Sequence, residues 1–65
     1  MTPAEVRARV AEISREASDW ERAHKCEDDL YLNVLNAIAE GAPNAKELAR
    51  EALVAHLIGF PRYVA

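Results

Sequence analysis

The chain has little of what usually braces a small protein. Cys26 is the only cysteine among its 65 residues, so no disulfide can form within the chain. A single cysteine is more typical of a reducing compartment than of a secreted protein, and we expect a cytoplasmic location. No basic stretch followed by an apolar run marks a signal peptide, and no apolar run approaches the ~18 residues of a membrane span. We therefore expect no membrane partner.

Positive charge is also scarce. Eight Lys and Arg residues stand against eleven Asp and Glu residues, which gives a net charge of −3. Six of the acids lie between Glu16 and Asp29 and form an acidic segment. Phosphate backbones are bound by clustered Lys and Arg, so this distribution weighs against nucleic-acid binding. It favours a solvated helix face or a docking surface for a basic protein.

Three helix-start signals are the most informative feature that is present. In each, a residue able to cap a helix stands three positions before a Glu whose side chain can bond back to the cap's own amide. They occupy residues 2–5, 18–21 and 44–47. The signals predict an all-α fold in a single domain over residues 1–65. The expected helices cover about residues 3–17, 19–40 and 45–58.

The turn after the second expected helix is better marked than the turn before it. Gly41 suits a left-handed C-cap and Pro43 cannot continue a helix, so we expect a tight corner there. No Gly or Pro separates the first two helices, and one continuous helix over residues 3–40 is the alternative. Such a helix would be too long to fold on itself and would need a partner chain.

We expect the second and third helices to pack antiparallel, as a helical hairpin or bundle. The apolar positions that would form this core are Leu30, Val34, Ile38, Leu48, Ala52 and Leu57. A domain this small buries only about 60% of its unfolded surface and usually needs a supplement. We therefore expect a homodimer through the apolar seam of the first helix, a protein partner, or both. The candidate partner-binding residues are Val6, Val10, Ile13, Trp20, Phe60 and Tyr63.

Four further residues, three aromatic and one histidine, each carry a specific expectation. Trp20 stands at the expected joint between the first two helices, where it either covers the joint or marks an interface hot spot. Phe60 and Tyr63 belong to an apolar tail that we expect to fold back onto the bundle or onto a partner. His56 lies on the apolar side of the third helix, and we expect it to be partly buried and structural.

One group of residues approaches a metal motif. Glu21, His24 and Asp28 can share one helical face, and Glu-x-x-His is the pair that di-iron helical bundles use. One chain supplies a single such pair, so a metal site would need a symmetric dimer. Cys26 lies two residues from His24 and points to another side of the helix, so the two cannot form a catalytic pair. We expect no metal, no cofactor and no enzyme activity.

Two resemblances add context. Residues 34–50, VLNAIAEGAPNAKELAR, carry an IAEG…N.KE.A pattern and resemble the scaffold helices of the LuxR-type helix-turn-helix. In that family a further helix enters the major groove, whereas Gly59 and Pro61 stand at that place here. The segments VRARVAEI, AHKCEDDLYLNVLNAIAEGAP, LAREAL and GFPRYVA resemble small uncharacterised proteins of actinobacteria and their phages. That resemblance implies an origin, and the host cytoplasm if the chain is phage-encoded, but no activity.

Together these features predict a small non-enzymatic protein–protein interaction module. We expect an accessory or regulatory factor, one that acts on a host protein if it is phage-encoded. Two alternatives remain open. One is a DNA-linked regulator, either a truncated helix-turn-helix or an antitoxin-like partner. The other is a dimeric metal-binding protein that uses Glu21, His24 and Asp28.

Overall fold

A computed structural model describes residues 1–62 and shows an all-α fold, as the sequence predicts. Helix α1 spans Pro3–Arg15, α2 spans Trp20–Ala39 and α3 spans Ala45–Leu53. A 3-10 helix, η1, continues α3 over Val54–Leu57, so the expected third helix changes its winding before its end. Within the described residues the chain forms no strand.

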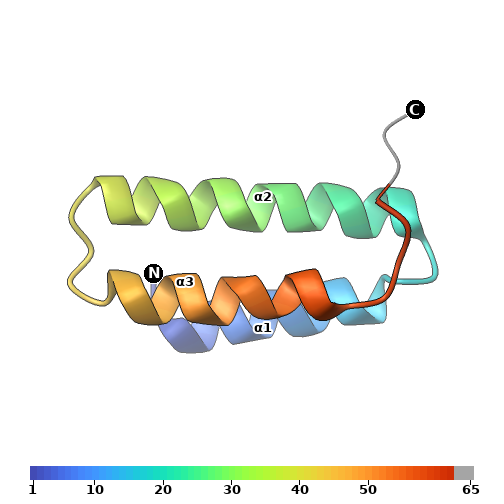
Figure 1. Cartoon of the computed structure of the whole chain (residues 1–65), viewed down its shortest axis with the longest axis horizontal. Helices are drawn as coiled ribbons and strands as arrows, with labels where there is room; N and C mark the ends of the chain where they lie inside the picture. The colour runs from blue at the N-terminus through green and yellow to red at the C-terminus, as the bar shows by residue number, and fades with distance from the viewer. Residues whose placement is uncertain (63–65) are drawn as a thin grey trace.

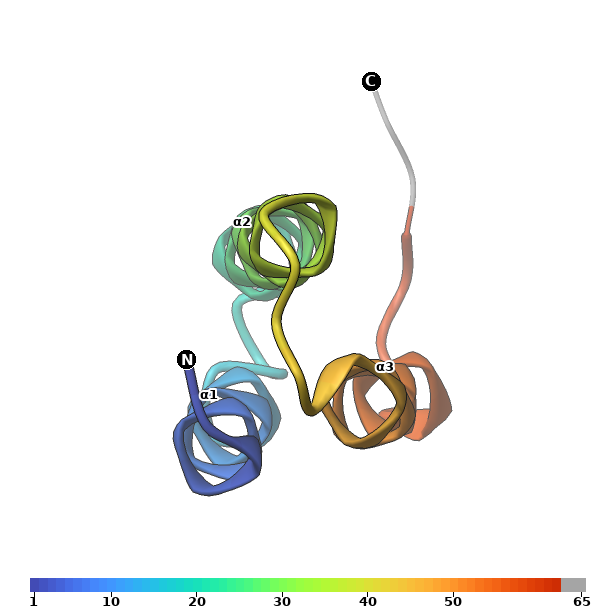
Figure 2. The same ribbon diagram turned by 90° about the vertical axis from the view of Figure 1, so that its left-hand side faces the viewer.

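The helices pack as an up-down-up bundle. Helices α1 and α3 lie side by side and run in the same direction, and α2 runs antiparallel to both (Figure 1). Seen along the bundle, the three helices form a triangle, in which α2 covers the furrow between the other two (Figure 2). After η1 the chain turns back toward the first turns of α2 (Figure 1). This return brings the C-terminal segment against the middle helix.

The first two helices are separate, which rules out one continuous helix over residues 3–40. Helix α1 ends at Arg15, two residues before the expected end, and residues 16–19 form turns. The cap of α2 is Asp19 rather than Ser18, and its carboxylate accepts a hydrogen bond from the amide of Arg22 at 3.3 Å. A carboxylate at this position also interacts favourably with the positive end of the helix dipole. The Ser18 signal is therefore displaced by one residue.

The other two helix-start signals have different outcomes. Thr2 and Glu5 form the expected capping box: the hydroxyl of Thr2 accepts from the amide of Glu5 at 3.2 Å, and the Glu5 carboxylate accepts from the amide of Thr2 at 3.1 Å. Asn44 precedes α3, but its side chain makes no capping hydrogen bond. Its amide group instead donates to the carbonyl of Met1 at 3.4 Å. The third capping prediction is therefore wrong, because a tertiary contact replaces the local one.

The corner between α2 and α3 confirms the prediction from Gly41 and Pro43. Gly41 has a φ of +92°, a conformation that side-chain-bearing residues rarely adopt. The amide of Gly41 donates a hydrogen bond to the carbonyl of Ile38, and the amide of Ala42 donates one to the carbonyl of Ala37. This pair of bonds is the Schellman motif, which satisfies the last carbonyls of the helix. The reversal sends α3 back along α2.

The core lies where all three helices meet. Its buried members are Val6, Ile13, Ala23, Leu30, Val34, Leu48, Ala52, Ala55 and Phe60, with Val10, Trp20 and Ile38 packed at its margin. Four of the six expected core residues are thus buried, but Leu57 is 80% exposed. His56, expected to be partly buried, is also exposed. Because α3 contacts α1 as well as α2, its buried face is centred on Leu48, and its outer edge faces solvent.

Candidate functional site

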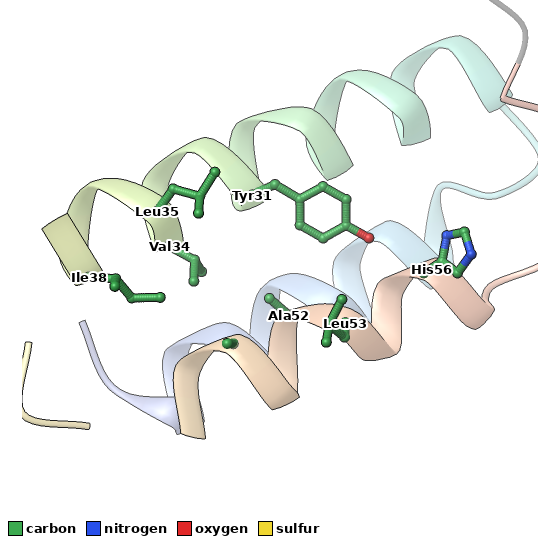
Figure 3. A pocket seen from close by; sticks show the side chains of 8 residues that line it. Tyr31, Val34, Leu35, Ile38, Ala52, Leu53 and His56 are labelled. Atoms are coloured by element: carbon green, nitrogen blue, oxygen red, sulfur yellow. The ribbon is translucent and has the colours of Figure 1, made fainter. Parts of the chain in front are cut away.

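An apolar groove runs between α2 and α3, on the side of the bundle away from α1. Its volume is about 550 Å³, and Figure 3 shows the side chains that line it. The lining residues are Tyr31, Val34, Leu35, Ile38, Ala49, Ala52, Leu53 and His56. The hydroxyl of Tyr31 and the ring nitrogens of His56 are the polar side-chain atoms among them. We call this feature the leucine groove, after Leu35 and Leu53.

Leucines stand exposed on both rims of the leucine groove. Leu35 on α2 and Leu53 on α3 are each 64% exposed, although both line the groove. Leu32 and Leu57 are also exposed, and each lies three or four residues from one of these two leucines. Residues three and four apart are neighbours on a helix surface, so each rim carries two adjacent leucines. Four exposed leucines thus lie in or near the groove, two on α2 and two at the end of α3 and in η1.

A pair of oppositely charged residues lies next to Tyr31, one of the residues that line the leucine groove. Glu27 on α2 is 4% exposed, and its carboxylate accepts two hydrogen bonds from Arg62: Nε to Oε1 at 3.1 Å and Nη2 to Oε2 at 3.0 Å. The same guanidinium donates to the carbonyls of Ala55 and Phe60, at 3.1 and 2.9 Å. It also lies over the Phe60 ring, 3.9 Å from the ring centre. We call this arrangement the Arg62 clasp, because it ties the returning segment to both α2 and η1.

Tyr31 connects the Arg62 clasp to the leucine groove. Its side chain extends from α2 toward α3 (Figure 3). Partial burial raises the pKa of the Tyr31 phenol above its usual value of 10.0, and the negative charge and hydrogen bond of Glu27 raise this pKa further. The phenol therefore stays protonated at neutral pH and donates a hydrogen bond to Glu27 beside the groove. Neither Tyr31 nor Glu27 was singled out from the sequence.

The three candidate metal ligands do not form a metal-binding group. His24 Nε2 lies 3.6 Å from a carboxylate oxygen of Asp28, which is an ordinary ion-pair geometry one helical turn apart. Glu21 is exposed on the same helix. Among the described residues, no group of three or more His, Cys, Asp or Glu side chains could hold a metal ion. Cys26 is unpaired and partly buried.

Three of the six candidate partner-binding residues lie in the core. Val6, Ile13 and Phe60 are buried, because α1 packs into the furrow between α2 and α3 and the C-terminal segment folds back over the bundle. The seam expected to face a second copy is therefore used within one chain. Val10 and Trp20 are partly buried against the same core, and Tyr63 lies outside the described residues. The fold-back of Phe60 itself confirms one of the two expected outcomes.

The sequence carried a signal for the leucine groove that could have been used. The third helix is apolar over more of its circumference than one buried stripe requires, and Leu35 widens the apolar face that Leu30, Val34 and Ile38 form on the second helix. Leucines in excess of a helix's own buried stripe predict a second apolar surface. The Arg62 clasp had no comparable signal, because its two members are 35 residues apart.

No protein-family model, no curated protein and no solved structure matches this chain. No helix within residues 1–62 is both long enough and apolar enough to cross a membrane.

Proposed function

We propose that this chain is a small non-enzymatic protein-binding module that docks through the leucine groove. The observation that carries the proposal is the exposure of Leu35 and Leu53 on opposite rims of one apolar groove. Contiguous exposed apolar surface with a polar surround is typical of protein interaction sites. An apolar groove between two helices is also the usual receptor for an apolar helix face of a partner.

The biological role that fits this surface is that of an accessory or regulatory factor. A compact bundle with one docking groove can occupy a partner's apolar helix face without performing chemistry on it. If the chain is phage-encoded, in line with its resemblance to small proteins of actinobacteria and their phages, a host protein in the cytoplasm is the natural target.

Capture from a host lysate with matched baits tests the proposal. Leu53→Asp places a charge on the rim of the leucine groove, and Val54→Asp makes the same change at the next residue, the first of η1, which faces the α1 side. Both positions are exposed, so circular dichroism should show folded bundles. We expect at least one protein to be retained by the wild type and by Val54→Asp but lost with Leu53→Asp. Identical protein sets on all three baits would contradict docking of a host protein in the leucine groove.

The two competing functions have direct tests of their own. DNA-linked regulation predicts a gel shift at physiological salt, which should weaken steeply as salt rises. A dimeric site at Glu21, His24 and Asp28 predicts that a metal co-purifies with the protein, which elemental analysis would detect. We expect neither.

A further inference from the structure

Two exposed stripes border the leucine groove, and each changes from charged to apolar along its length. On α2 the stripe is formed by Glu21, Asp28, Leu32, Leu35 and Ala39. On α3 and η1 it is formed by Lys46, Arg50, Leu53 and Leu57. All of these residues are exposed, and consecutive members are three, four or seven positions apart, so each set occupies one side of its helix. Both stripes start with charge and continue with leucine.

The antiparallel packing of α2 and α3 turns these two stripes into a diagonal pattern. Glu21 is in the first turn of α2, and Asp28 is in the same half of this helix, the half toward the end of the bundle where η1 lies. Lys46 is in the first turn of α3 and Arg50 in its last turn, and α3 runs antiparallel beside the half of α2 that ends at Ala39 (Figure 1). The leucines stand between the two charged ends. Lys25, one turn from both acids, offsets part of the charge at the acidic end. The face thus has an acidic end, an apolar centre and a basic end.

Resting on the proposed function, we propose that the occupant of the leucine groove is a second copy of this chain. A face with opposite charges at its two ends is complementary to itself. Rotation by 180° about an axis in the plane of contact, crossing the line between the two ends, places the basic end of each copy over the acidic end of the other. The same rotation brings the rim leucines of the two copies together at the centre.

The charges and the leucines of this face determine which groups an occupant of the groove must present. Any occupant has to offer apolar side chains to Leu35 and Leu53, negative charge to Lys46 and Arg50, and positive charge to the acidic end. The chain's own face offers all three kinds of group. A domain of this size also gains most from association, because its own core is small. Apolar contact drives the association, whereas the exposed charges set its orientation and make it sensitive to salt.

The decisive experiment exchanges the charges at the two ends. In one variant Lys46 and Arg50 are both replaced by Glu, so that its two ends are both acidic. In the other, Glu21 and Asp28 are both replaced by Lys, so that its two ends are both basic. Sedimentation velocity over a concentration series should show a wild-type dimer. The dimer dissociation constant of each variant should be at least about tenfold higher than that of the wild type. An equimolar mixture of the two variants should form a heterodimer, because opposite ends then face one another again.

Two single variants locate the interface. Leu53→Asp should leave a folded monomer at concentrations where the wild type is dimeric, whereas Val54→Asp should dimerise as the wild type does. A wild type that stays monomeric throughout the series would overturn the second-copy proposal, as would a dimer whose affinity Leu53→Asp leaves unchanged. Groove-dependent capture of a host protein by a monomeric wild type would overturn the second copy alone and leave the proposed function standing. If neither capture nor dimerisation depends on the groove, both the second-copy proposal and the proposed function are overturned.

Discussion

Arg62 donates to both carboxylate oxygens of Glu27, over 3.1 Å from Nε and 3.0 Å from Nη2. The side chain of Glu27 is 5% exposed and that of Arg62 is 26% exposed, so the two partners differ in their access to water. The contact joins the middle of the longest helix to the returning C-terminal segment. It therefore stabilises a segment that has no regular secondary structure of its own.

The unequal burial of this pair predicts unequal effects of its two single substitutions. Arg62→Met leaves the Glu27 carboxylate buried without its counter-charge, and we expect a loss of about 2–3 kcal/mol in the free energy of unfolding. Glu27→Leu should cost less, because the Arg62 side chain can turn toward water. The double variant should recover much of the loss, since an apolar pair of similar volume replaces the ionic one. Urea denaturation followed by circular dichroism measures all three. An equal or larger loss for Glu27→Leu would contradict this account.

The start of α2 predicts which of two adjacent residues caps the helix. Asp19→Ala removes the side chain that accepts from the amide of Arg22 and should lower the free energy of unfolding by about 1 kcal/mol. Ser18→Ala is the matched control, because the Ser18 side chain caps nothing and is exposed. Its effect should stay within about 0.5 kcal/mol. Thermal or urea denaturation gives both values, and a larger loss for Ser18→Ala would assign the cap to Ser18.

The two glycines of the chain should respond differently to alanine. Gly41 has a φ of +92°, so Gly41→Ala should lower the free energy of unfolding by about 1–2 kcal/mol, although nothing lies within 4 Å of the added Cβ. Gly59 also has open space around it, and its φ is not in the left-handed region. Gly59→Ala should therefore be neutral or slightly stabilising, through the reduced freedom of the unfolded chain. Equal losses for the two would refute the backbone explanation.

Tyr31 predicts a loss of stability in alkaline solution. The folded chain holds the phenol proton more tightly than the unfolded chain, because burial and Glu27 raise the folded-state pKa above 10.0. The stability contributed by this group is therefore fully present below about pH 10 and is lost as the pH rises through the folded-state pKa. Tyr31→Phe should be less stable than the wild type by about 1 kcal/mol near neutral pH, through the lost hydrogen bond to Glu27.

Comparing the wild type with Tyr31→Phe separates the effect of Tyr31 on stability from that of the lysines, which titrate in the same pH range. The urea denaturation midpoints of the wild type and of Tyr31→Phe, measured from about pH 8 to about pH 11, should approach one another as the pH rises. A difference that is independent of pH would show that Tyr31 has the same proton affinity in both states.

Local sequence was sufficient for the helices and for two of their boundaries. The capping box of Thr2 and Glu5 and the left-handed Gly41 were predicted correctly, because each depends on hydrogen bonds within a few residues. The prediction for Asn44 failed for the opposite reason. Its side chain is within reach of Met1, which only the packed bundle brings close.

Which apolar side chains are buried could be learned only from the tertiary structure. Helix α3 has more apolar positions than one interface can cover, and periodicity alone favoured the side that contains Leu57. Because α3 also packs against α1, its buried face is centred on Leu48 and Ala52, and the leucines at its edge remain exposed. The same three-way packing buried Val6 and Ile13, which the sequence had offered as a surface.

The sequence by itself thus determined an all-α chain with three helices and a tight corner at Gly41, since helices form through contacts between near neighbours. Only the tertiary structure decided which apolar residues became core and which became the leucine groove, and that Arg62 would meet Glu27. Those outcomes depend on side chains that are distant along the chain and meet only when the helices pack.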